Sequence, residues 1–313
     1  MLSRTADSLF WLNRYMERAD GILRFTRTAY ISVLDKGITE NLTWRPLLEI
    51  FTNSTEEEIE SLENNTNEVL KKVILDVDNT NSLKTLVNRA RENARGVQDH
   101  ITKEVWENVN QMYHMINNPA IAAQLLSENS MEVIDLFTKQ SVLYAGVTDI
   151  TMPRGIGWNF MNLGKYIERC LETLEITDRE FKTINYDLAD EQDILYWRVL
   201  LLSISGYELH LKTYRDSNDN KSVLQQAIMN ANFTRSVIYS LTRIHRYLED
   251  LVKGNESPEN QALIRCFGRL YSYVKFIDFD TLDTVILQEF LEKVKTELLN
   301  FSWRFGQSFF SYS

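Results

Sequence analysis

Glycine and proline are scarce in this chain of 313 residues. It contains 11 glycines and 4 prolines, less than half of the roughly 12% that these two residues contribute to an average protein. Sandwiches, barrels and propellers need many tight turns, and such turns depend on glycine and proline. With 25% charged and 11% aromatic residues, the composition is typical of a packed globule and not of a disordered chain. The sequence therefore predicts an all-α fold.

Cysteine is rarer still, and the two cysteines are Cys170 and Cys266. Neither belongs to a C-x-x-C pair or to a Cys/His cluster, and each sits inside an apolar helical pattern. Free cysteine is among the most buried residue types. We therefore expect both thiols to be reduced and buried.

Long hydrophobic runs are also lacking. The apolar run at residues 9–12 has only four residues and follows Arg4 and Asp7, which is too short for a signal peptide or a membrane span. A formal net charge of −10 disfavours nucleic acid and anionic membrane, because binding to either needs a dense basic surface. We expect a cytoplasmic protein that binds neither, although a local basic pocket is compatible with this charge.

Helical periodicity fills most of the chain, and short polar breaks divide it. The breaks lie near residues 36–41, 76–82, 117–119, 151–157, 185–193, 215–222, 253–260 and 277–280. No glycine-, serine- or proline-rich linker separates one part from another. The pattern predicts a single compact bundle of nine or ten helices over residues 1–313.

Capping signals place several helix ends. We expect a first helix over residues 3–34, a long helix over residues 82–116, and a last helix from about Thr281. Ser54 and Glu57 have the spacing of a capping box, and Pro153 suits the first turn of a helix that continues past residue 169. The end of the last helix is rich in aromatic residues: Phe301, Trp303, Phe305, Phe309, Phe310 and Tyr312. We expect this end to pack on the body, and an exposed partner-binding surface is the alternative.

Two segments of the chain repeat a pattern. Residues 12–19 and 163–170 share L-x-[RK]-Y-x-E-R at an offset of 151, close to half the chain. Aromatic residues come shortly before the repeated pattern in each segment. The match suggests two related halves, 1–150 and 151–313, and chance repetition of eight residues remains the alternative.

Basic side chains cluster in these segments. On a helix, Arg14, Glu17 and Arg18 lie at i, i+3 and i+4, so that a carboxylate sits between two guanidinium groups. Lys165, Glu168 and Arg169 repeat this spacing. One interpretation is that such clusters are ion pairs that join neighbouring helices. The other is that they converge on a pocket for phosphate or carboxylate groups, which guanidinium forks bind bidentately. The candidate anion-binding residues are Arg4, Arg14, Arg18, Arg91, Arg95, Arg154, Lys165, Arg169 and Arg235.

At these residues the chain resembles the alpha-E domain family, a bacterial group of all-helical domains of unknown biochemical activity named for a Glu-Arg motif. The similarity covers most of the chain and is clearest at residues 1–19, 81–82, 90–95, 157–169 and 235–237. Two positions depart from the family pattern. Thr234 stands where the family commonly has proline, and Gly155-Ile156 where a more polar pair is usual, so these loops are expected to differ.

The resemblance implies partner proteins for this chain and does not imply a particular reaction. Proteins of this family are typically encoded beside, or fused to, circularly permuted ATP-grasp proteins that look like peptide or amide ligases, often with a transglutaminase-like protease nearby. ATP-grasp ligases pass through an acyl phosphate. A helical partner with arginine-lined clefts could therefore bind the ligase, guide its anionic substrate, or shield the intermediate from water.

Common catalytic and cofactor motifs are lacking. No histidine has a glutamate three residues before it, as a di-iron bundle requires, and no H-E-x-x-H, D-D-x-x-D, G-x-x-x-x-G-K-[ST] or G-x-S-x-G occurs. Residues 155–160 lack the third glycine of a dinucleotide-binding loop. We therefore expect neither a metal ion nor a cofactor.

Two functions of different classes remain. The first is a non-catalytic helical subunit of an ATP-grasp peptide ligase system. The second is an enzyme of the same pathway, with Glu17 or Glu168 as a weak candidate for a general acid or base. A carboxylate between two guanidinium groups is a poor base, because opposite charges favour its ionised form. The subunit is therefore the preferred hypothesis.

Overall fold

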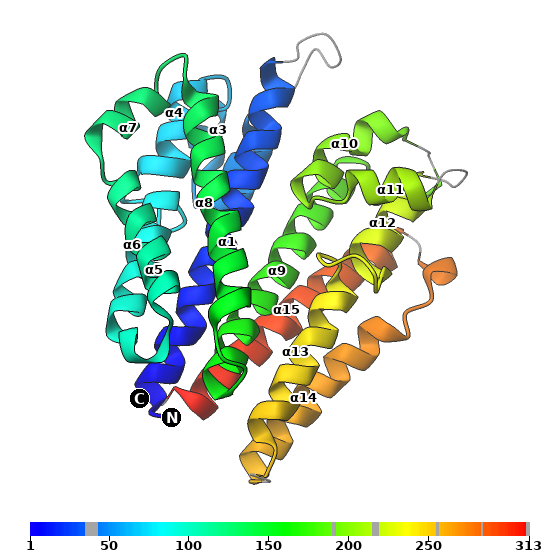
Figure 1. The fold of residues 1–313 in the computed structure, drawn as a ribbon. Helices are drawn as coiled ribbons and strands as arrows, with labels where there is room; N and C mark the ends of the chain where they lie inside the picture. Colours follow the sequence, from blue (N-terminus) through cyan, green and yellow to red (C-terminus); the bar gives the residue numbers. More distant parts are fainter. Residues whose placement is uncertain (35–42, 190–191, 215–218, 255–256, 283, 311–313) are drawn as a thin grey trace. The chain divides into compact units, whose positions relative to one another are not determined.

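The computed structural model describes residues 1–34, 43–189, 192–214, 219–254, 257–282 and 284–310 (Figure 1). These residues form α-helices, short 3-10 or π turns and connecting loops, and contain no β-strand. The expected all-α fold is confirmed. The expected number of helices is wrong, because the described residues form fifteen α-helices instead of nine or ten.

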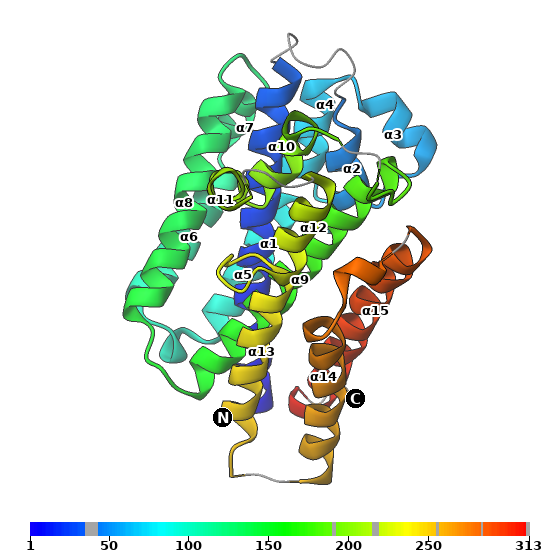
Figure 2. The ribbon, with the colours of Figure 1, turned by 90° about the vertical axis from the view of Figure 1, so that its right-hand side faces the viewer.

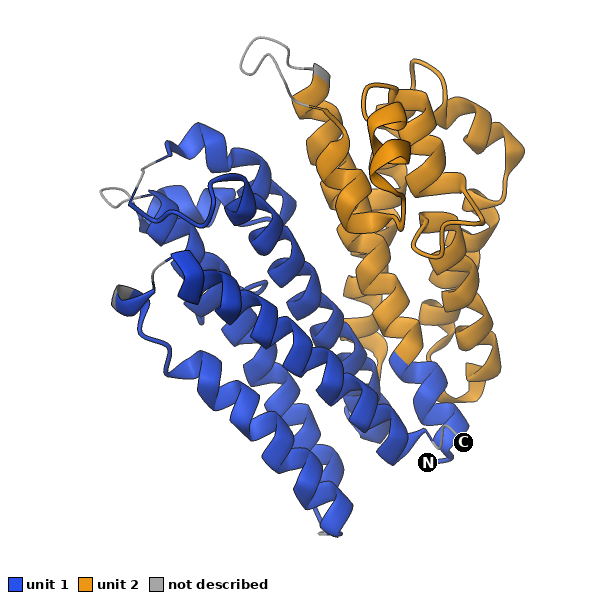
Figure 3. Cartoon of the chain, turned by 180° about the vertical axis from the view of Figure 1, so that it is seen from behind, with its two compact units in different colours: residues 1–10, 154–313 blue, residues 11–153 orange. Residues whose placement is uncertain are grey.

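The described chain divides into two compact units, which Figure 3 shows in different colours. Unit 2 comprises residues 11–153, and unit 1 comprises residues 1–10 and 154–313. The first helix begins in unit 1 and continues in unit 2. A single domain over 1–313, with halves 1–150 and 151–313, stays a prediction.

Unit 2 is built from the rest of the first helix and seven further helices. They are α1 (Ser3–Leu34), α2 (Arg45–Phe51), α3 (Glu56–Leu62), α4 (Thr66–Leu70), α5 (Leu83–Gly96), α6 (Lys103–Ile116), α7 (Pro119–Leu125) and α8 (Ser130–Thr151). A π turn, Lys71–Leu75, follows α4. Helix α6 packs between α5 and α8.

Unit 1 contains the first turns of α1 and seven helices. They are α9 (Ile156–Thr183), α10 (Ile194–Ser203), α11 (Tyr207–Thr213), α12 (Asp219–Met229), α13 (Val237–Val252), α14 (Pro258–Lys275) and α15 (Thr284–Phe309). Helix α13 packs along α9, and α14 lies beside both α13 and α15 (Figure 2). The pairing of α9 with α13 positions the site described below.

The helix expected over residues 82–116 is two helices. Its start is confirmed, because the hydroxyl of Ser82 caps α5 by accepting from the backbone N–H of Thr85 at 3.2 Å. The chain then breaks after Gly96, and Thr102 caps α6 through the backbone N–H of Val105. The apolar period continues across the break because α5 and α6 fold back on each other and bury the same kind of face.

Other helix ends differ from the sequence prediction by one to three residues. The capping box is formed by Thr55 and Glu58 instead of Ser54 and Glu57. Pro153 lies in the turn between α8 and α9 instead of in a first turn. Helix α15 starts at Thr284, because a separate 3-10 turn occupies Phe279–Thr281. The predicted bounds of α1, residues 3–34, are confirmed.

Aromatic residues of the last helix pack in the core of unit 1. The ring of Phe305 lies 5.6 Å from that of Phe10 and 6.0 Å from that of Phe160. Phe301, Phe305 and Phe310 are buried, as expected, whereas Trp303 is 63% exposed. Tyr312 lies outside the described residues.

The first turns of α1 approach α9 backbone to backbone. A Cβ atom on Gly164 would collide with the backbone carbonyl oxygen of Phe10. Glycine is therefore required at this crossing, for reasons of space and not of backbone conformation.

The remaining composition-based expectations can be compared directly. Cys170 and Cys266 are free and buried, as predicted. In the part of the chain that the structure describes, no helix combines the length and the apolar character needed to cross a membrane.

Candidate functional site

Both Glu-Arg segments place their glutamate and arginine in the same way. Glu17 on α1 is 7% exposed, and Glu168 on α9 is 4% exposed. The arginine that follows each, Arg18 or Arg169, is partly buried. Each segment is thus a buried carboxylate with a cation at its edge.

In unit 2, the segment on α1 contacts the start of α5. One guanidinium nitrogen of Arg18 donates to Oδ1 of Asn81 at 2.8 Å, just before the capping residue Ser82. Arg14 is buried, with its guanidinium carbon 5.0 Å from the centre of the Trp11 ring. Both cations therefore have defined protein partners.

Arg91 and Arg95 lie at the other end of α5. Both form ion pairs with Glu92, at 3.0 and 2.6 Å, and Arg91 also donates to Oδ1 of Asn110 at 3.0 Å. Ten residues separate Asn81 from Arg91, which is about 15 Å along a helix. The contacts thus place Arg18 near the start of α5 and Arg91 and Arg95 near its end.

In unit 1, the segment on α9 contacts the turn before α13. A guanidinium nitrogen of Arg169 donates to the backbone oxygen of Thr234 at 3.3 Å. The hydroxyl of Thr173 donates to the backbone oxygen of Arg235 at 2.8 Å. The Nζ atom of Lys165 lies 5.7 Å from the Tyr166 ring, and the guanidinium carbon of Arg169 lies 5.3 Å from it. The structure thus brings together Lys165 and Arg169 and joins α9 to the Arg235 turn.

The sequence analysis missed one further residue of this region, Arg243 on α13. Its guanidinium group donates to the Tyr239 hydroxyl at 2.8 Å and lies 4.9 Å from the Tyr239 ring. The Tyr166 ring lies 6.2 Å from the ring of Tyr239 and 6.1 Å from that of Tyr247. In the sequence, the i, i+4 spacing of Tyr239 and Arg243 places both side chains on one face of a helix. That this face lies beside Tyr166 becomes clear only from the packing of α13 on α9.

The environment changes the acidity of two of these groups. Burial raises the pKa of Tyr166 to about 12, although the charges of Arg169 and Arg243 act in the opposite direction. The hydrogen bond to Tyr239 raises the pKa of Arg243 above its ordinary value. Tyr166 is therefore a protonated hydrogen-bond donor, and Arg243 is a permanent cation, throughout the physiological range.

The turns that the two segments contact are alike. In both turns the backbone N–H of a serine, Ser82 or Ser236, donates to the carbonyl oxygen three residues earlier at 3.0 Å, and that serine caps the following helix, α5 or α13. An arginine follows seven residues after each capping serine, Arg89 and Arg243. The resemblance between the two parts of the chain therefore extends beyond the eight residues of the repeated pattern.

The two remaining basic candidates lie near the starts of α1 and α9. Arg4 is exposed. Arg154 is also exposed, and its guanidinium carbon lies 3.7 Å from the centre of the Trp158 ring. The anion-binding role of Arg4 and Arg154 stays a prediction.

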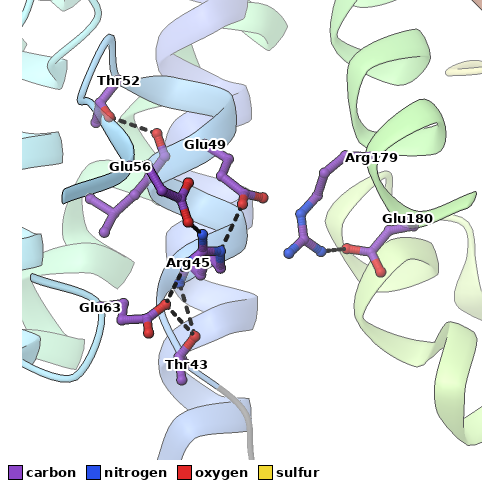
Figure 4. A network of polar contacts seen from close by, with 9 residues as sticks. Thr43, Arg45, Glu49, Thr52, Glu56, Glu63, Arg179 and Glu180 are labelled. Atoms are coloured by element: carbon purple, nitrogen blue, oxygen red, sulfur yellow. Dashed lines mark hydrogen bonds and ion pairs between the residues drawn. The ribbon is translucent and has the colours of Figure 1, made fainter. Parts of the chain in front are cut away.

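A second charged network lies in unit 2, around Arg45 (Figure 4). Arg45 pairs with Glu49 at 2.9 Å, with Glu63 at 3.3 Å, and with Glu56. Three carboxylates on one guanidinium leave a net negative charge, which disfavours an anion. Arg179 and Glu180 of unit 1, also drawn in Figure 4, pair with each other at 2.6 Å. These groups fit the ion-pair interpretation.

A cavity of about 440 Å³ lies between α6 and α7. It is lined by Trp106, Glu107, Asn110, Gln111, His114, Met115, Asn118 and Ile121. None of the predicted anion-binding residues lines it. Among the described residues, no group of three or more His, Cys, Asp or Glu side chains is arranged to hold a metal ion.

Comparison with known proteins gives relatives without an assigned activity. The chain is 22% identical over 278 residues to the uncharacterized proteins Mb2597 of Mycobacterium bovis and Rv2567 of Mycobacterium tuberculosis. The match covers 83% of this chain and 31% of each relative. The chain thus spans about a third of the length of these curated relatives. No solved structure matches it.

The repeated Glu-Arg pattern agrees with a family model that matches residues 1–310. That family is described as a predicted alpha-helical domain with a conserved ER motif. Because the match covers nearly all of the sequence, the chain belongs to the Alpha-E family.

Proposed function

We propose that this chain is an accessory, non-catalytic helical component of an ATP-grasp peptide or amide ligase system. It binds the ligase, its anionic peptide substrate, or both, through the basic residues of the Glu-Arg segments. The circularly permuted ATP-grasp partner and a transglutaminase-like protease as a second partner come from the family resemblance stated above. The cytoplasmic setting is the expectation drawn above from the composition and the apolar runs.

The observation that carries this proposal is the length of the relatives. The match covers 83% of this chain but only 31% of each mycobacterial protein. In those relatives the helical region is therefore one part of a much longer chain, whose other parts lie beside it on the same polypeptide. The proposal assigns the same kind of arrangement to this chain, as a helical component that acts next to the other parts of such a system.

The basic region of unit 1 supports the anion-binding part of the proposal. Lys165, Arg169 and Arg243 lie around Tyr166, and guanidinium groups bind phosphate and carboxylate oxygens through paired hydrogen bonds. An anionic substrate or acyl phosphate has the charge that such a region favours.

The alternative function is an enzyme of the same pathway. Its supporting observation is that Glu17 and Glu168 are buried carboxylates, as general acids and bases often are. Each is followed directly by arginine, and an adjacent cation favours the ionised form and makes a weaker base. The accessory role is therefore preferred.

The test mixes the purified chain with a circularly permuted ATP-grasp protein, and measures ATP hydrolysis and peptide product. We expect turnover only with both proteins, and unchanged turnover with Glu17→Gln or Glu168→Gln. Glu104→Gln, at an exposed position on α6, is the control, and circular dichroism checks that each variant folds.

Two other results would reject the accessory role. Product formed by this chain alone, and lost in Glu168→Gln or Glu17→Gln, would establish the enzyme. The partnership would be rejected if the ligase did not bind the chain and if the turnover of the ligase were the same with and without the chain.

A further inference from the structure

Arg243 is a partly buried cation without an acidic partner. Among the described residues, no carboxylate lies within ion-pair distance of it, and its contact is with Tyr239. Two other partly buried arginines pair with acids: Arg24 with Asp20 at 3.1 Å, and Arg179 with Glu180 at 2.6 Å. Removing a charge from water costs free energy unless an opposite charge offsets it.

The groups around Arg243 present positive charge and hydrogen-bond donors. The Tyr166 ring lies 5.3 Å from the guanidinium carbon of Arg169 and 6.2 Å from the ring of Tyr239, whose hydroxyl accepts from Arg243. Guanidinium groups have only donors to offer, and a protonated phenol can donate as well. Lys165 approaches the same Tyr166 ring at 5.7 Å. Donors and cations from α9 and α13 thus meet in one region of unit 1.

We propose that Arg243, Arg169 and Tyr166 form a binding site for a phosphate-class oxyanion. This proposal specifies the ligand of the anion-binding role in the proposed function, and it rests on that role. Arg243 lies in the second turn of α13, so the donors are side chains and not the helix terminus. The ligand is a phosphoryl group, either as free phosphate or as part of a phosphomonoester.

Charge favours phosphate over a carboxylate. The region carries Lys165, Arg169, Arg235 and Arg243, and the same stretch of α9 carries two buried acidic residues, Glu168 and Glu172. The excess of cations matches a dianion better than a monoanion. Phosphate also has more oxygens with which to accept from two guanidinium groups and a phenol.

Isothermal titration calorimetry of the full chain with inorganic phosphate tests the site at constant low ionic strength, with sodium acetate as the monoanionic comparison. We expect saturable phosphate binding, and at least tenfold weaker acetate binding. Arg243→Gln should weaken phosphate binding at least tenfold, and Tyr166→Phe should weaken it less. Arg243→Lys, which keeps the charge, should restore part of the affinity.

Arg246→Gln is the matched control, because Arg246 is an exposed arginine on the same helix. It should bind phosphate within twofold of the unsubstituted chain. Thermal unfolding followed by circular dichroism shows whether each variant is folded at the titration temperature. If Arg243→Gln alone fails to fold, the decision falls to Arg243→Lys and Tyr166→Phe, and unchanged affinity in both overturns the site.

The proposal is also overturned if the chain does not bind phosphate, if acetate binds equally well, or if folded Arg243→Gln binds like the unsubstituted chain. Titration with O-phospho-L-serine identifies the source of the ligand: binding at least as tight as that of phosphate indicates a phosphomonoester, and weaker binding indicates the free ion. These titrations contain no ligase. A result that rejects the phosphate site is therefore distinct from a result that rejects the ligase partnership.

Discussion

The two Glu-Arg segments are alike in pattern but differ in their surroundings. In both, the arginine donates to the turn that precedes a serine-capped helix, through Asn81 for Arg18 and through Thr234 for Arg169. In both, an arginine follows seven residues after the capping serine. Arg89 is exposed, with its guanidinium carbon 6.0 Å from the Tyr15 ring. Arg243 is partly buried and donates a hydrogen bond to the Tyr239 hydroxyl.

The acidic residues differ as well. On α5, Glu92 pairs with both Arg91 and Arg95, whereas Arg243 on α13 has no carboxylate at ion-pair distance in the described residues. At equivalent positions, the same local pattern therefore places an exposed arginine in unit 2 and a partly buried arginine in unit 1, where we propose an anion site. The neighbouring helix, and not the Glu-Arg motif, determines the difference.

The largest effect is expected at the position where the segments differ most in size. Gly164 on α9 corresponds to Asn13 on α1 at the offset of 151. In Gly164→Ala the new Cβ would collide with the backbone of Phe10, so α9 and the first turns of α1 must separate. We expect the free energy of unfolding to fall by about 3 kcal/mol in urea denaturation.

Gly146→Ala on α8 is the control for that substitution. Nothing lies within 4 Å of its Cβ position, so alanine should stabilise the helix by up to about 1 kcal/mol. Equal effects of the two substitutions would show that helix propensity, and not the crossing, determines stability at Gly164.

The corresponding position in unit 2 is expected to have a smaller effect. The buried Tyr144 hydroxyl donates to Oδ1 of Asn13 at 2.5 Å, and burial raises the pKa of Tyr144 far above its ordinary value. Tyr144→Phe removes this bond and should lower the free energy of unfolding by about 1.5 kcal/mol. A loss below about 0.3 kcal/mol in urea denaturation would contradict a structural role for the pair.

The burial of histidine differs between the two units and should make the stability of unit 1 depend on pH. In unit 2, His100 and His114 are exposed, whereas in unit 1 His210 is 1% exposed and its Nδ1 lies 3.0 Å from Oε1 of Gln226. Burial lowers the pKa of His210. Below about pH 6.5 the unfolded chain therefore binds a proton that the folded chain does not, and stability falls as the pH falls.

The measurement compares the original chain with His210→Gln in urea at pH 7.5 and pH 5.5. The original chain should lose about 1 kcal/mol more than the variant between these pH values. His114→Gln is the control, and it should leave the pH dependence of the original chain unchanged. A pH dependence that persists fully in His210→Gln would assign the effect to other groups.

The sequence predicted the features that depend on neighbouring residues. The bounds of α1 and the Ser82 cap follow from local periodicity and hydrogen bonding. The break between α5 and α6 was missed, because the apolar period resumes in phase after Thr102 and the connection at residues 97–102 contains neither glycine nor proline. Only three polar residues, 63–65, separate the short helices α3 and α4, and in the sequence they resemble an exposed face of one helix.

The candidate site was predictable to the same extent. The i, i+3 and i+4 spacing of Lys165, Glu168 and Arg169 is a local property of a helix. The role of Arg243 was not predictable, because it depends on the packing of α13 against α9, more than sixty residues earlier in the chain. An arginine four residues after a tyrosine has no such meaning until the tertiary contact is known.

The smallest effect is expected at Arg89, the counterpart of Arg243. Its side chain is exposed and its interaction with the Tyr15 ring spans 6.0 Å, so Arg89→Gln should change the free energy of unfolding by less than about 0.5 kcal/mol. Phosphate affinity in calorimetry should also stay within twofold, in contrast to the loss expected for Arg243→Gln. If Arg89→Gln instead weakened phosphate binding as much as Arg243→Gln does, the two segments would be equivalent in function, and partial burial of the arginine would not be what creates the site.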